Sequence, residues 1–100
     1  MSVYLINAKG TNNYKIGITN DIDINKRIKS LQTGNPFILE LIHLYYSANS
    51  SKLEKLLHAE YKNKQTNSEW FELTEQDVSC FLDKCKIYDN FLMNLIQINI

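Results

Sequence analysis

The stretch YKIGITNDIDINKRIKSLQTGNP, residues 14–36, decides the fold. It opens with an apolar, β-forming run, turns at residues 19–21, and continues with helical spacing. Apolar Ile24, Ile28 and Leu31 follow at i, i+4 and i+7, which places them on one face of a helix. The stretch therefore predicts a strand, a turn and an amphipathic helix.

The ends and the basic residues of this helix follow from the same stretch. Asn20 or Asp21 is the expected N-cap, and Gly34-Asn35-Pro36 is a strong stop signal. At about 100° per residue, Arg27 lies roughly 65° from the centre of the apolar face.

Two lysines of the same helix, Lys26 and Lys29, point further toward solvent. They are expected to contribute to substrate binding.

The segments on either side of this stretch predict further strands. SVYLIN, residues 2–7, reads as a strand, and AKGTNN, residues 8–13, carries turn chemistry. We expect an antiparallel hairpin over residues 2–18 with a loop of about six residues. FILELIHLYY, residues 37–46, is apolar on both faces and predicts a central strand covered on both sides.

The second half of the chain predicts two helices. KLEKLLHAEYK forms the first, KNKQTNS reads as a loop, and EWFEL, residues 69–73, as an extended or irregular run. Thr74 caps a last helix, whose apolar stripe runs from Val78 to Ile96. We therefore predict an α/β fold: a small three-stranded antiparallel sheet flanked by helices in residues 1–73. Residues 74–100 form a C-terminal helix that packs on this core or makes an oligomer contact.

Length and composition limit the classes of protein. One hundred residues make one domain, and the net charge is zero. The charge is uneven, because residues 1–66 hold nine Lys/Arg against five Asp/Glu, which allows one basic face. Cys80 and Cys85 have neither disulfide-framework nor zinc-site spacing, so we expect free thiols. With no signal peptide and no apolar run long enough to span a membrane, we expect an intracellular protein, cytoplasmic or nuclear, that is not secreted.

Four features stand in a set order along the chain: Tyr4, Lys15-Ile16-Gly17, Arg27 and Glu54. This order resembles the GIY-YIG endonuclease superfamily, whose name-giving tripeptides here appear as Ser2-Val3-Tyr4 and Lys15-Ile16-Gly17. The blocks Y-K-I-G-x-T, L-Q-T-G-N-P, L-E-K-x-x-H and E-W-F are similar to a phage and viral branch. The match covers about residues 2–73.

The resemblance implies a metal-dependent endonuclease that hydrolyses DNA, and it suggests a role for each residue. Arg27 and Lys15 would hold phosphate, and Glu54 would bind Mg²⁺ or Mn²⁺. Tyr4 would orient or activate water, if a metal or cation lowers its pKa. His58 would relay a proton or support the metal site.

The glycine that ends the second strand raises a separate question. Gly17 removes a side chain where the backbone must approach a bulky ligand, so we expect it to leave room for DNA.

Two residues leave alternatives open. Lys15 stands where the wider family has tyrosine, which puts the usual role of that tyrosine in doubt. Ser51-Lys52-Leu53-Glu54 fits a capping box if the helix starts at Ser51. If Asn49 is the cap instead, Glu54 is free for metal. Trp70 and Phe71 fit a core position, and also base stacking.

Two other functions fit the sequence. The first is a module of the same fold that grips nucleic acid or a protein partner without cutting. The second is an interaction protein that forms a homodimer through its C-terminal helix.

Overall fold

The structure, a computed structural model, describes residues 1–20 and 22–98, and only the backbone of residues 96–98. Asp21 as a helix cap and the side chain of Ile96 lie outside the described residues. The elements in chain order are β1 (Ser2–Ala8), β2 (Asn13–Thr19), α1 (Ile24–Gln32), β3 (Leu39–Tyr46), α2 (Ser50–Glu60), the 3₁₀ turn η1 (Lys62–Lys64), β4 (Gln65–Asn67), β5 (Trp70–Glu72), α3 (Glu75–Ser79) and α4 (Phe81–Ile98).

The sheet is antiparallel, as predicted, but it has five strands in the order β3-β1-β2-β5-β4 rather than three. The two additional strands, β4 and β5, form a short hairpin from the predicted loop and the E-W-F run. Three residues per strand are too few to show an alternating pattern in the sequence. The β1–β2 hairpin is confirmed, with a turn at residues 9–12 that is shorter than expected.

The prediction that residues 37–46 form a central strand was wrong: β2 is the middle strand, and β1 lies between it and β3. All of β1 from Val3 to Ala8 is buried, whereas β3 lies at the edge of the sheet and exposes Leu44 and Tyr46. A register shift opposite Leu5 and Ile6 makes Ile42 an extra residue in β3. The extra residue shifts the alternation of side chains along β3. The apolar pattern on both faces of this segment is therefore that of a bulged edge strand and not that of a central strand.

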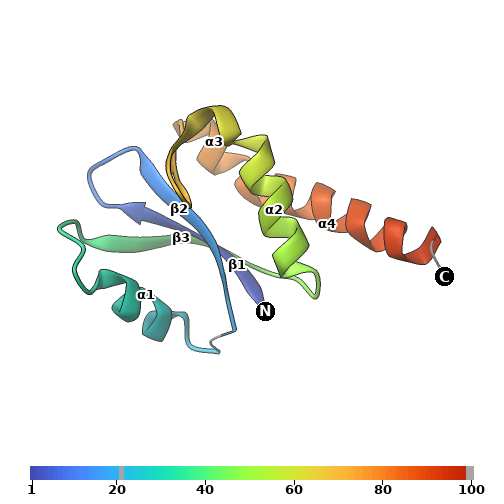
Figure 1. The fold of residues 1–100 in the computed structure, drawn as a ribbon, viewed down its shortest axis with the longest axis horizontal. Coiled ribbons are helices and arrows are strands. Elements are labelled where there is room, and N and C mark those ends of the chain that lie inside the picture. Colours follow the sequence, from blue (N-terminus) through green and yellow to red (C-terminus); the bar gives the residue numbers. More distant parts are fainter. Residues whose placement is uncertain (21, 99–100) are drawn as a thin grey trace.

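Helices cover both faces of the sheet (Figure 1). On one face, Val3, Leu5 and Ile16 belong to a large core with side chains of α2 and α4. On the other face, Tyr4 and Ile6 belong to a smaller core that the apolar residues of α1 complete. Successive residues of β1 point to opposite faces, so this one strand contributes to both cores.

Helix α1 has the predicted apolar face but a different cap. Ile24, Ile28 and Leu31 pack against the smaller core, as expected. The N-cap is Asp23 rather than Asn20, and its side chain accepts a hydrogen bond from the backbone N–H of Asn25 at 3.0 Å. Aspartates at positions 21 and 23 give similar capping signals, so the sequence did not separate them.

The predicted last helix is two helices. Thr74 caps α3 in a capping box with Asp77, which confirms the cap, but Cys80 interrupts the helix and α4 begins at Phe81. Phe81, Cys85 and Leu92 are buried in the large core. The stripe does not stay buried to its end, because Leu95 is 45% exposed.

Two composition-based predictions can be compared with the structure. Cys80 and Cys85 are both free thiols, as expected. Among the described residues, no helix has the length and apolar character needed to cross a membrane.

Candidate active site

Tyr4 and Gly17 face each other across the β1–β2 pair. A Cβ atom added to Gly17 would lie 2.3 Å from the Tyr4 hydroxyl and 2.5 Å from the ring carbon that carries it. Real Cβ atoms do not approach other atoms so closely. Gly17 therefore makes room for the phenol of Tyr4. That it also leaves room for DNA stays a prediction.

The phenol of Tyr4 is buried, and its hydroxyl has no hydrogen-bond partner of normal geometry. Burial raises the pKa of this hydroxyl, and the nearby Arg27 guanidinium lowers it only in part. The charges of Glu69 and Glu54 also raise the pKa. In the protein alone the pKa of Tyr4 is thus raised, and the phenol is protonated at neutral pH.

Arg27 approaches Tyr4 from α1, on the same face of the sheet. Its side chain is half-buried, and its Nε atom is buried without a hydrogen-bond partner. In the part of the chain that the structure describes, Arg27 forms no ion pair. Lys26 and Lys29 are exposed on the same helix, as predicted. The arginine is therefore partly enclosed by the protein, while part of its guanidinium lacks a protein partner.

Glu54 does not form the capping box that its sequence allowed. Helix α2 begins after Asn49, so Glu54 lies beyond the first turn. Its Oε2 atom is buried without a hydrogen-bond partner. Burial, and then the negative charge of Glu69, raise the pKa of Glu54, while His58 and Lys15 lower it. This carboxyl group is thus destabilised in its charged form and lacks a protein partner for one oxygen.

Glu69 is a member of the cluster to which sequence reasoning gave no role. Its carboxylate forms an ion pair with Lys15 at 2.8 Å. The Lys15 side chain is only 14% exposed, and its ammonium lies 5.8 Å from the centre of the Trp70 ring. Glu69 opens the E-W-F block, so the block itself was the available signal.

His58 joins α2 to the strand that carries Gly17. Its Nε2 donates a hydrogen bond to the backbone carbonyl of Ile16 at 2.9 Å, and its ring makes a T-shaped contact with the ring of Phe71. The backbone N–H of Ile16 donates to the carbonyl of Glu69 at 3.0 Å. The ladder between β2 and β5 covers Asn13 to Lys15, and the bond from Ile16 to Glu69 continues it by one residue.

Three of these groups share an unusual property: Tyr4 Oη, Arg27 Nε and Glu54 Oε2 are all buried polar atoms without partners. A buried polar group left unpaired costs about 1–3 kcal/mol. The groups come from β1, α1 and α2, and Tyr4 responds to the charges of both others. Such a concentration indicates a site whose partners come from outside the chain.

The donor set fits a hard cation better than a zinc ion. The described residues contain no group of three or more His, Cys, Asp or Glu that could hold a metal. Mg²⁺ typically binds through one or two carboxylates and completes its shell with water and substrate phosphate. Glu54, with a buried oxygen that lacks a partner, and the neighbouring Glu69 meet that requirement.

A family model described as the T5orf172 domain matches residues 1–86, which include every residue of this cluster. The family is generally considered GIY-YIG-like. No curated protein and no solved structure matches the chain. Because the model spans most of the chain, this protein belongs to the T5orf172 domain family.

Proposed function

We propose that this protein is a GIY-YIG-type endonuclease that uses Mg²⁺ or Mn²⁺ to hydrolyse phosphodiester bonds of DNA. The observation that carries the proposal is the convergence of three unpartnered groups, Tyr4 Oη, Arg27 Nε and Glu54 Oε2. Phosphodiester hydrolysis needs a positioned water, charge neutralisation on the phosphate and a metal ligand. Tyr4 would position the water, Arg27 would neutralise the charge of the phosphate, and Glu54 would bind the metal.

The cations of the site would bind the phosphate. Arg27 has a planar, permanently charged group that forms paired hydrogen bonds with phosphate oxygens. Lys15 on β2 would add a second positive charge, and the exposed Lys26 and Lys29 of α1 would extend the contact along the DNA backbone. The half-buried position of Arg27 would help to fix the phosphate relative to the sheet.

Tyr4 and Glu54 would organise the chemistry. The phenol of Tyr4, protonated at neutral pH, would hold a water or a phosphate oxygen by a hydrogen bond. Glu54 would hold the metal, with Glu69 next to it. A bound Mg²⁺ would supply positive charge to the phosphate and lower the pKa of its water ligands.

His58 would act one step away from the metal. A carbonyl only accepts hydrogen bonds, so Nε2 carries the proton that binds Ile16 and the neutral ring keeps Nδ1 as an acceptor. His58 lies one helical turn after Glu54. When Nδ1 takes up a proton, the positive charge of the ring lowers the pKa of that carboxyl. We propose that it relays a proton or supports the metal ligand.

A second candidate is a module that binds nucleic acid or a protein without cutting. The observation in its favour is the Lys15–Glu69 ion pair, which neutralises the one cation that replaces the family's tyrosine. Under this hypothesis the cluster binds phosphate, and no hydrolysis follows.

Cleavage of supercoiled plasmid in MgCl₂ and in EDTA tests the proposal. We expect nicking that needs the metal and that falls by orders of magnitude in Glu54→Gln and in Arg27→Ala. The two losses should be strongly non-additive, because groups that act on one phosphate act as a unit. Glu40→Gln and Lys52→Ala are matched controls, since both residues are exposed and lie outside the cluster.

The opposite result would be equally clear. Wild-type rates in Glu54→Gln would exclude the metal-ligand role. A salt-sensitive gel shift without any cleavage would favour the binding module.

A further inference from the structure

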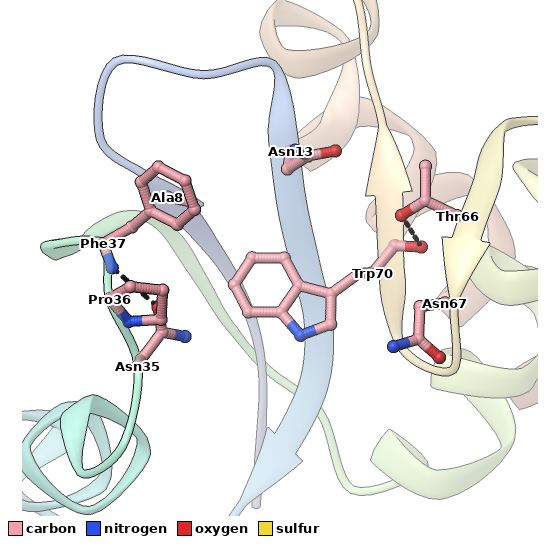
Figure 2. Close-up of a pocket in the computed structure, with 8 residues that line it drawn as sticks. All are labelled: Ala8, Asn13, Asn35, Pro36, Phe37, Thr66, Asn67 and Trp70. Atoms are coloured by element: carbon pink, nitrogen blue, oxygen red, sulfur yellow. Dashed lines mark hydrogen bonds between the residues drawn. The ribbon is translucent and has the colours of Figure 1, made fainter.

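A cleft of about 370 Å³ opens next to the proposed active site, between the segment that follows α1 and the β4–β5 hairpin. Figure 2 shows the indole of Trp70 standing between Pro36 and Phe37 on one side and Thr66 and Asn67 on the other. Ligand pockets in proteins typically begin at about 300 Å³. The cleft is therefore large enough for a small planar group.

The residues that line the cleft combine flat apolar groups with neutral hydrogen-bonding groups. Trp70, Phe37 and Pro36 supply the apolar surface, and none of the lining residues that the structure describes is charged. The amides of Asn13, Asn35 and Asn67 also line it. An amide offers a donor and an acceptor together.

One of these amides keeps its donor available. The oxygen of the Asn35 side chain accepts a hydrogen bond from the backbone N–H of Phe37 at 3.0 Å, so this contact leaves the amide N–H₂ group unused. Phe37 is 48% exposed, although it is aromatic. This lining suits an uncharged planar ring whose edge carries both donors and acceptors.

The position of Trp70 connects the cleft to the phosphate site. Lys15, which we propose to hold phosphate, has its ammonium 5.8 Å from the centre of the Trp70 ring. Trp70 is the first residue of β5 and follows Glu69 directly in the chain. It pairs with Lys15 of the neighbouring strand β2. A nucleotide with its phosphate at Lys15 would thus have its base within reach of the indole.

We propose that this cleft holds one nucleobase, taken out of the base stack, of the DNA whose phosphate binds at Lys15 and Arg27. The proposal rests on the proposed function and narrows its substrate to DNA with an unpaired nucleotide at the cleavage site. Aromatic side chains bind unstacked bases by stacking with little dependence on sequence. The amides would meet the edge of the base.

The protein's only tryptophan is Trp70, so its fluorescence reports on the cleft without any need for cleavage. The probe is a short oligothymidylate in EDTA, and the control probe is a fully abasic oligomer of the same length and charge. Fluorescence anisotropy of a labelled end measures total binding of each. We expect oligothymidylate to quench Trp70 and to bind about 5- to 100-fold more tightly than the abasic oligomer.

Protein variants separate the base contact from the phosphate contact. Phe37→Ala and Asn67→Ala should weaken the binding of oligothymidylate and leave the abasic oligomer unaffected. Tyr46→Ala is the matched control, because Tyr46 is 73% exposed on β3 and does not line the cleft. Arg27→Ala should weaken both probes by the same factor.

The outcomes distinguish this proposal from the proposed function. Equal binding of the two probes with unchanged Trp70 fluorescence would overturn the base cleft and leave phosphate binding intact. Loss of both probes to the same extent in Phe37→Ala would also overturn it. If neither probe binds at low salt, this proposal fails, while the DNA-cleaving function is decided separately by plasmid cleavage in MgCl₂.

Discussion

At the scale of single residues, the site is built at a cost to the stability of the fold. The glycine at position 17 is required because the phenol of Tyr4 occupies the space of its side chain. The carboxyl group of Glu54 is buried near Glu69, which raises its pKa. Both features place polar groups where the protein alone does not satisfy them, as is common where a ligand completes a site.

The first prediction concerns the stability of Glu54→Gln. The pKa of Glu54 is raised in the folded protein, so the folded state disfavours the charged form. Stability is therefore lost as the pH rises from the unfolded pKa through the folded one. In metal-free buffer at pH 7–8 we expect Glu54→Gln to melt a few degrees higher than the wild type.

Thermal melts across pH check this prediction. The gain should vanish at a pH low enough to protonate Glu54 in both states. Glu40→Gln, at an exposed position, should leave the melting temperature unchanged at every pH. A lower melting temperature for Glu54→Gln at neutral pH would contradict the argument.

The second prediction concerns the pH dependence of cleavage. Glu54 must be ionised to hold a metal, and Lys15 lowers its pKa while Glu69 raises it. We expect Lys15→Met to move the acid limb of kcat/KM to higher pH, and Glu69→Gln to move it to lower pH. The double variant should lie between them.

The control for this profile is Lys9→Met, which removes a positive charge at an exposed position outside the cluster. Its acid limb should match that of the wild type. If the acid limbs of Lys15→Met and Glu69→Gln both match that of the wild type, neither residue acts on Glu54.

At the scale of elements, a buried carboxylate ties α4 to the sheet. Asp89 of α4 is 9% exposed and accepts hydrogen bonds from Tyr45 Oη at 3.0 Å and Ser47 Oγ at 2.7 Å. Hydrogen bonds to charged groups contribute about 1.5–3 kcal/mol each. The two hydrogen bonds thus fix α4 against the end of β3.

The third prediction follows from the pKa of Tyr45. Burial and the Asp89 carboxylate raise the pKa of Tyr45 to about 12. A raised tyrosine pKa contributes stability that is present below the unfolded value near 10 and is lost as the pH rises toward 12. We expect Tyr45→Phe to be less stable than the wild type at neutral pH, with a difference that shrinks above pH 10.

Urea unfolding at several pH values measures this difference. Tyr46→Phe is the matched control, because its neighbour Tyr46 is 73% exposed and should show no such trend. A constant difference between Tyr45→Phe and the wild type up to pH 12 would contradict the role of the hydrogen bond.

At the scale of the whole molecule, the C-terminal helices complete the core and then extend beyond it. The molecule measures 47 × 29 × 21 Å, and the far end of α4 projects along the longest direction (Figure 1). Ile87, Phe91 and Leu95 are exposed at i, i+4 and i+8 on this helix. One side of α4 thus belongs to the domain, and another side presents apolar residues outward.

The fourth prediction is that a chain cut after Leu73 does not fold stably. The cut removes Phe81, Cys85 and Leu92, which are buried in the same core as Val3 and Leu5. We expect aggregation or loss of the cooperative thermal transition, measured by light scattering and circular dichroism. A soluble fragment as stable as the full chain would show that α3 and α4 are not part of the folding unit.

The fifth prediction concerns self-association. We propose that two copies pair through the exposed stripe of α4, because apolar residues at four-residue spacing form a surface that fits a second helix of the same kind. Ile87→Glu or Phe91→Glu should then shift the protein to monomer in sedimentation and leave the fold intact. Lys86→Glu, an exposed neighbour, is the control. A wild-type chain that is monomeric at high concentration would exclude the dimer.

The sequence by itself determined the local elements and the identity of most of the cluster. The spacing of Ile24, Ile28 and Leu31, the cap at Thr74 and the β1–β2 hairpin depend on neighbours along the chain, and the structure confirms them. The order of the motifs along the chain likewise predicts that Tyr4, Arg27 and Glu54 belong to one site.

Only the tertiary structure decided how these elements meet. It placed β3 at the edge of the sheet, added β4 and β5, and brought Glu69 against Lys15. It also showed that the phenol of Tyr4 occupies the space where a side chain at position 17 would lie, and that Trp70 lines a cleft. Each of these results depends on contacts between residues that are distant in sequence. A local sequence pattern does not specify which distant residues will lie next to it in the fold.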